Sequence, residues 1–183
     1  MSNAHPTGAS LGSAVLPSER CTAAWSVLAN VPDPELPTVS LCDLGIVRDV
    51  HVDGGVLQVV LTPTYSGCPA TEVISHSVQE ALLGAGLGPV SVKQQLAPAW
   101  TTDWISESGR EKLLASGIAP PNGNASMAST GQAQPLRFFS RPVACPRCGS
   151  GRTERLSAYG STACKSMHRC LACLEPFEHF KPI

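Results

Sequence analysis

The sequence predicts an α+β protein, in which a small domain of the order α-β-β-α-β-α precedes a metal-binding module. Two observations lead to this prediction. Along the first 118 residues, apolar positions alternate between the helical period and the two-residue period of strands. Five of the eight cysteines lie in the last 39 residues, and four of these form Cys-x-x-Cys pairs. We therefore expect a three-stranded mixed sheet with its helices, followed by a zinc ribbon.

Composition divides the 183 residues into four segments. Residues 1–16 are small, polar and unpatterned, which predicts a disordered tail. Residues 17–118 form the α+β domain, 119–135 are rich in Pro, Gly, Asn and Ser and predict a flexible linker, and 136–183 form the ribbon. Eleven acidic and five basic side chains give residues 1–135 a charge of −6, whereas three acidic and eight basic side chains give the ribbon +5. This asymmetry indicates two modules with different contact surfaces.

The first helix is expected to begin at Ser18 and to end near Asn30, because two prolines follow. Its buried face would carry Cys21, Trp25 and Leu28, which recur at helical spacing. We expect the tryptophans of this chain in the core rather than at a cofactor.

Two strands over residues 44–52 and 56–61 would form a hairpin through the turn Asp53-Gly54-Gly55. A helix is expected after Cys68, and alternating residues from Val90 to Leu96 predict a third strand. If this strand is parallel to the second, the connection is a right-handed βαβ crossover.

A last helix would be capped by Thr101-Thr102-Asp103 and would end at Gly117. Its inward side chains are expected to be Trp104, Ile105, Leu113 and Leu114.

Cys68 is the first candidate for chemistry. Pro69 suits the first position of a helix, so Cys68 is expected at the N-cap, where free N–H groups and the helix dipole favour a thiolate. The crossover would bring it to the carboxyl edge of the sheet, where α/β sheets place their sites. A small buried cysteine without a function is the alternative.

The segment Asp33-Pro34-Glu35-Leu36-Pro37 predicts a stiff loop that carries two carboxylates. Asp33 and Glu35 could be held toward a site. An ordinary solvated turn would explain the same residues.

Two Cys-x-x-Cys pairs with 21 residues between them predict one tetrahedral site, whose ligands are Cys145, Cys148, Cys170 and Cys173. Four thiolates suit zinc and leave no open position for catalysis, although rubredoxin-like iron takes the same ligands. Cys164 is a surplus thiol, either buried or a spare reactive sulfur, and we expect it to be buried. His168 and His179 could substitute as ligands, but four cysteines already complete the shell.

Several of these motifs together resemble a known family. Asp33-Pro34-Glu35-Leu36-Pro37 with Leu44-Gly45-Ile46-Val47, the segment from Thr62 to Pro69, and Trp100-Thr101-Thr102-Asp103-Trp104-Ile105 resemble the small domain of SufT-type iron–sulfur assembly factors. Gly160-Ser161-Thr162-Ala163-Cys164-Lys165 narrows the resemblance to the PaaD family of phenylacetate-degradation proteins. The resemblance covers roughly residues 18–118 and 137–182.

The resemblance implies an accessory component of the phenylacetyl-CoA 1,2-epoxidase system, which pairs a di-iron oxygenase with a flavin and iron–sulfur reductase. These two components would be the partners, and the chain would assist insertion of iron or clusters without a catalytic activity of its own. Cys68 would be the functional thiol, Glu35 and Asp33 its acidic companions, and the four paired cysteines the zinc ligands.

The residues agree with transient capture of iron or a cluster. One thiolate and two carboxylates are too few ligands for tight retention, unless a homodimer or a partner adds sulfur. The sequence has no Glu-x-x-His motif of a di-iron site and no Gly-x-Gly-x-x-Gly of a nucleotide cofactor. Neither a secretion signal nor an apolar run near ~18 residues is present, so the expected location is the cytoplasm, without membrane contact.

Three other functions are open at this stage. The chain could be a purely structural scaffold of the oxygenase complex, with Cys68 incidental. The basic ribbon could bind nucleic acid, although it lacks the dense basic run that is typical of such proteins. A thiol enzyme would need a histidine beside Cys68, which the sequence does not place there.

Overall fold

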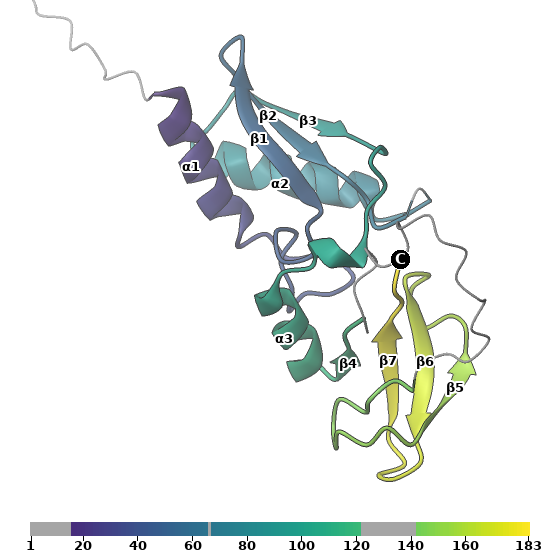
Figure 1. Ribbon diagram of the computed structural model, residues 1–183. Helices are drawn as coiled ribbons and strands as arrows, with labels where there is room; N and C mark the ends of the chain where they lie inside the picture. Colours follow the sequence, from purple (N-terminus) through teal and green to yellow (C-terminus); the bar gives the residue numbers. More distant parts are fainter. Residues whose placement is uncertain (1–15, 66, 122–141) are drawn as a thin grey trace, which may run out of the picture.

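The computed structural model describes residues 16–65, 67–121 and 142–183, and it confirms the α+β class (Figure 1). In chain order, the elements are α1 (Pro17–Leu28), β1 (Val47–Asp53), β2 (Val56–Leu61), α2 (Thr71–Gly84), β3 (Val90–Gln94), the 3-10 helix η1 (Thr102–Trp104), α3 (Glu107–Ala115), β4 (Ile118–Ala119), β5 (Thr153–Ser157), β6 (Lys165–Cys170) and β7 (Pro176–Phe180). In this part of the chain, no helix has the length and apolar character to cross a bilayer.

The first sheet has the strand order β1-β2-β3. β1 and β2 are antiparallel, and Gly54 and Gly55 turn the hairpin with φ of 56° and 83°, as the sequence predicts. β2 and β3 are parallel, and α2 forms the crossover between them. Alternate residues of β2, Leu57 and Val59, are fully buried with residues of α1 and α2 in the main core. The predicted three-stranded mixed sheet is confirmed.

Two predicted core positions are wrong. Trp25 is 38% exposed, because the buried stripe of α1 runs through Ala24 and Leu28 instead. Leu114 is 47% exposed, whereas Leu113 is fully buried. A short helix buries a narrow stripe, so only one of two successive leucines can face the core.

The last helix begins later than predicted. Thr101 caps η1, where its hydroxyl accepts from Asp103 N–H, and α3 is capped by Ser106, whose hydroxyl accepts from Gly109 N–H at 2.9 Å. Gly117 ends the helix with φ of 79°, as expected.

The second sheet has the order β4-β7-β6-β5, with β5, β6 and β7 antiparallel. β4 is the exception, because its two residues precede the ribbon and pair with β7 in parallel. Ala119, which composition places at the start of the linker, is therefore a buried strand residue. The remainder of the predicted linker, from 122 onward, and residues 1–15 of the predicted tail lie outside the described residues.

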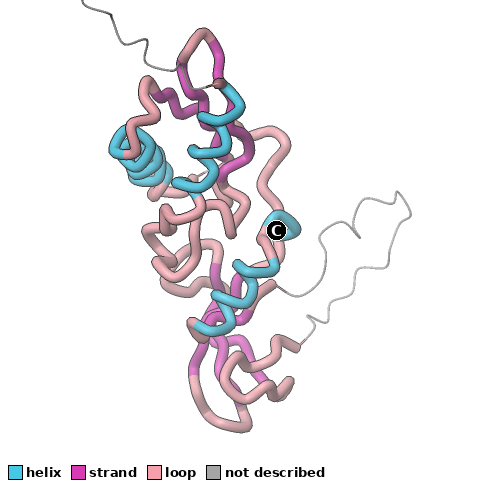
Figure 2. Tube along the Cα trace, turned by 90° about the vertical axis from the view of Figure 1, so that its left-hand side faces the viewer, coloured by secondary structure: helices cyan, strands magenta, loops and turns pink. Residues whose placement is uncertain are grey.

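The ribbon is docked on the first domain, and Figure 2 shows the two sheets at opposite ends of an elongated molecule. Phe180 of β7 is 1% exposed and lies in the core of the first domain, with its ring centroid 5.9 Å from that of Trp100. The backbone N–H of Thr102 donates to the carbonyl of Ile183 at 3.2 Å. The ribbon thus adds Phe180 and Cys164 to the core of the first domain and keeps a second, small cluster of its own.

Candidate functional site

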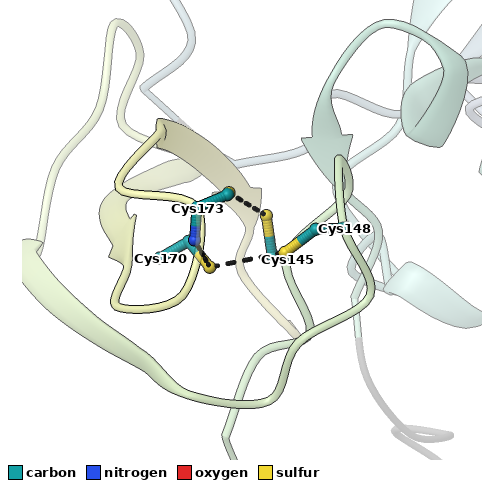
Figure 3. Close-up of side chains that lie close together, drawn as sticks. All are labelled: Cys145, Cys148, Cys170 and Cys173. Carbon is teal, nitrogen blue, oxygen red and sulfur yellow. Dashed lines mark hydrogen bonds between the residues drawn. The ribbon is translucent and has the colours of Figure 1, made fainter.

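Four cysteines from two loops of the ribbon point toward one another (Figure 3). They are the predicted ligands Cys145, Cys148, Cys170 and Cys173, and their sulfurs all lie within 4.8 Å of one another. Cys145 Sγ lies 3.7 Å from Cys173 Sγ, and Cys148 Sγ lies 3.6 Å from Cys170 Sγ. A tetrahedral zinc with bonds of about 2.3 Å sets its sulfurs roughly 3.8 Å apart. The donor set thus fits zinc.

Backbone N–H groups steady the sulfurs of this cluster. The N–H groups of Cys173 and Ala172 donate to Cys170 Sγ, and the Cys173 bond is the main cause that lowers the pKa of Cys170 to about 6. The Glu175 backbone lowers the pKa of Cys173. Burial and the side chains of the three neighbouring cysteines raise it by more, so that the net pKa is about 12. Four crowded thiolates repel one another, and a divalent cation removes that repulsion.

His168 and His179 are not part of this cluster. Both are buried beside each other with ring centroids 5.4 Å apart, and burial lowers the pKa of each. The Ser166 hydroxyl lies 3.0 Å from Nε2 of His168. They pack within the ribbon, as the complete shell of cysteines predicts.

Cys68 does not occupy the helix N-cap, so that prediction is wrong. The N-cap of α2 is Ala70, and Cys68 lies two residues before it. The N–H and hydroxyl of Thr71 both donate to the carbonyl of Cys68, at 3.3 and 2.7 Å, so a turn precedes the helix. The half-buried thiol still lies beyond the end of β2, at the carboxyl edge that the crossover predicts.

Asp33 and Glu35 lie on a loop that the buried carboxylate of Asp33 organises. Its Oδ1 accepts the backbone N–H groups of Glu35 and Leu36, both at 2.9 Å. Burial nevertheless raises the pKa of Asp33. Burial and the neighbouring charge of Asp33 raise the pKa of Glu35 as well. Asp33 therefore shapes the loop, and the half-buried Glu35 is the more available ligand.

The ribbon contributes Cys164 to the same place. Cys164 is 5% exposed, and it precedes β6 on the loop that begins at Gly160. The adjacent Lys165 is 2% exposed and forms an ion pair with Glu178, with 2.8 Å between Nζ and Oε2. The other carboxylate oxygen of Glu178 accepts the Ser161 N–H. These bonds fix the loop from both ends.

A narrow pocket of about 10 Å³, room for about one water molecule or a single ion, joins these groups. Its lining includes four residues that can ligate metal, namely Asp33, Glu35, Cys68 and Cys164. The backbone N–H of Cys68 donates to the Tyr65 carbonyl at 3.2 Å. Burial raises the pKa of Tyr65, and the charges of Cys68, Glu35 and Cys164 raise it further. The charge of Lys165 also acts on the pocket, because it opposes, without reversing, the rise in pKa that burial causes in both carboxyls.

Sequence reasoning brought Cys68 together with Asp33 and Glu35, but it missed the place of Cys164, Lys165 and Tyr65. The prediction that Cys164 is buried is confirmed. The available signal was the motif from Gly160 to Lys165, which carries a thiol and a cation but supplies no ligand to the four-cysteine cluster.

Comparisons with known proteins agree with both modules. Residues 22–93 match the family described as iron–sulfur cluster assembly protein, and residues 130–181 match the PaaD zinc beta ribbon domain. "Fe-S protein maturation auxiliary factor YitW" of Bacillus subtilis (strain 168) is 39% identical over 80 residues, which cover 42% of this chain and 76% of that protein. A crystal structure of a domain of unknown function, DUF59, from Bacillus anthracis is 26% identical and covers 53% of this chain and 93% of its own, with a TM-score of 0.49. That score is too low to add to the fold described above.

The fold and its two sites define a class of protein in which an iron–sulfur cluster assembly domain is joined to a four-cysteine zinc ribbon. A subunit of the "Putative 1,2-phenylacetyl-CoA epoxidase" of Escherichia coli (strain K12) is 45% identical to the chain over 159 residues, 87% of this chain and 91% of that protein. The chain belongs to the PaaD family.

Proposed function

We propose that the chain is an accessory maturation subunit of a phenylacetyl-CoA 1,2-epoxidase, and that it receives iron or an iron–sulfur cluster transiently at Cys68. The observation that carries this proposal is the pocket that Cys68, Glu35 and Asp33 line together. The similarity to an epoxidase subunit over most of both chains, and to a maturation factor over the first domain, supports the pathway and the task.

The chemistry of the pocket suits capture followed by release. Among the described residues, only the ribbon cysteines bring three or more ligand atoms within 4.8 Å of one another, so the pocket offers no closed ligand shell. Burial raises the pKa of both carboxyls, and a cation bound beside them would lower it again, because a nearby positive charge favours the ionised form. Iron held by few ligands leaves easily for a client with more of them.

The ribbon has a different task in this proposal. Its cluster binds one zinc ion permanently, and the metal holds together a module with a small core of its own, which includes Val143 and Phe177. The proposed clients are the oxygenase and reductase components. We place the chain in the cytoplasm, a reducing compartment in which the thiols of Cys68 and of the zinc ligands would stay available for metal.

Cys68→Ser tests the proposal in cells that carry the complete epoxidase system. We expect the cluster content of the reductase and the epoxidase activity to fall about tenfold or more, the usual scale for loss of a metal-site residue. Cys21→Ser is the matched control, because Cys21 is a half-buried thiol of α1 that does not line the pocket. Unchanged cluster content and activity in Cys68→Ser would refute the thiol role and favour a structural scaffold.

A further inference from the structure

We infer that Cys164 is a second thiol ligand for the iron or cluster at Cys68, so that the two modules share one capture site. The inference rests on the proposed function and deepens it. No homodimer is then needed to supply a further sulfur, because the ribbon of the same chain supplies it.

The thiol of Cys164 lies on a residue that the ribbon contributes to the pocket. Cys164 and Phe180 are the two ribbon residues that line the pocket, and the pocket is otherwise built by the first domain. Phe180 is an apolar ring that packs on Trp100, so Cys164 is the ribbon residue of the lining whose side chain can ligate a metal. Two thiols and two carboxyls therefore line one pocket, and these are groups that ligate iron.

Cys164 is also held in place by hydrogen bonds within the ribbon. The Cys164 carbonyl accepts the Lys181 N–H at 2.9 Å, and the Thr162 hydroxyl lies 3.0 Å from its sulfur. Lys165, the next residue, is fixed by Glu178. The chain is thus held in place on both sides of Cys164, as it is around the ligands of a metal site.

Glu35 and Cys164 line the same pocket, so their charges influence each other. Burial raises the pKa of Cys164, the Thr162 hydroxyl lowers it, the charge of Glu35 raises it and the charge of Lys165 lowers it. A cation bound between Glu35 and Cys164 would stabilise both as anions, as at the four-cysteine cluster. Thiolates are the ligands that iron–sulfur clusters use, and Glu35 would complete a set of two sulfurs and one oxygen.

The test uses the full-length, zinc-loaded protein without air, titrated with Co²⁺ as a visible substitute for Fe²⁺. Cobalt follows iron in the order of divalent affinities, and its thiolate bonds absorb in the near ultraviolet. A zinc indicator in the same cuvette confirms that the ribbon keeps its zinc. We expect Cys164→Ser to show about half of the wild-type charge-transfer absorption and a roughly tenfold or greater loss of affinity, with Cys68→Ser alike. Cys42→Ser, a half-buried thiol outside the pocket, should match the wild type.

A second measurement needs no substitution, in case Cys164→Ser folds poorly. Mass spectrometry follows the rate at which iodoacetamide labels each cysteine of the wild-type protein, with and without Co²⁺. Protection of both Cys68 and Cys164 supports the shared site. Protection of Cys68 alone, with unchanged cobalt binding in Cys164→Ser, overturns the inference and leaves the proposed function standing. Absence of cobalt binding outside the ribbon, or full binding by Cys68→Ser, overturns both.

Discussion

Phe180→Ala should weaken the docking of the ribbon more than the ribbon itself. Phe180 belongs to β7, yet its ring is buried in the core of the first domain against Trp100. Truncation of a fully buried phenylalanine costs about 3–5 kcal/mol, out of a total stability of about 5–15 kcal/mol. We expect urea unfolding of the zinc-loaded protein, followed by tryptophan fluorescence, to report a loss in this range. Because Phe180 also lines the pocket, native-state alkylation of Cys164 should accelerate.

Phe177→Ala is the matched control for this prediction. Phe177 lies on the same strand and is also buried, but it packs in the separate ribbon cluster and stacks on His168 at 5.6 Å. Its truncation should lower stability and leave the labelling rate of Cys164 much less affected. A loss below about 1 kcal/mol for Phe180→Ala, or equal acceleration of Cys164 labelling in both variants, would refute the packing of Phe180 in the core of the first domain.

Three further predictions concern charge and metal. Burial raises the pKa of Asp43, but hydrogen bonds from Lys112 and two serines lower it more, to about 2. The stability that this group contributes should therefore be present above about pH 4 and be lost toward pH 2, by about 1–2 kcal/mol after solvent screening. Asp43→Asn should flatten this part of the plot of unfolding free energy against pH. Lys165→Met leaves half-buried Glu178 without its ion-pair partner and should cost up to about 3 kcal/mol in urea unfolding, with partial recovery in Lys165→Met/Glu178→Gln. A loss near zero would contradict the pairing. Chelation should release one zinc per chain and speed amide exchange in β5, β6 and β7 before α1 and β1–β3, and equal exchange in both modules would contradict a metal-stabilised ribbon.

Local signals in the sequence predicted most of the first domain. The Asp53-Gly54-Gly55 turn and the alternation in β2 and β3 depend on neighbouring residues only, and each element formed where expected within a few positions. The errors occur where tertiary packing decides. The sequence predicts the N-cap at Cys68, but the helix has its N-cap at Ala70. The Thr71 hydroxyl donates to the Cys68 carbonyl, so that Cys68 belongs to a turn before the helix.

The sequence predicted the part of the candidate site that lies in the first domain and missed the part that depends on how the ribbon docks. Asp33, Glu35 and Cys68 follow from motifs within one domain, and they do line one pocket. The place of Cys164 depends on how the ribbon docks, and the docking contacts, which include the Trp100–Phe180 pair and the pairing of β4 with β7, have no periodic pattern in the sequence. Besides the motif from Gly160 to Lys165, a large aromatic residue at position 180 of a module with a small core was a further hint.

The strand β4 makes the boundary between the modules less clear than the composition indicates. Residues Ile118 and Ala119 belong by sequence to the first domain, but their hydrogen bonds go to β7. If the chain were cleaved between Pro121 and Pro142, the two fragments would still meet along a paired strand edge and a common aromatic contact. Such fragments should reassemble without a covalent connection, and a ribbon expressed from residue 136 onward would lack one edge of its own sheet.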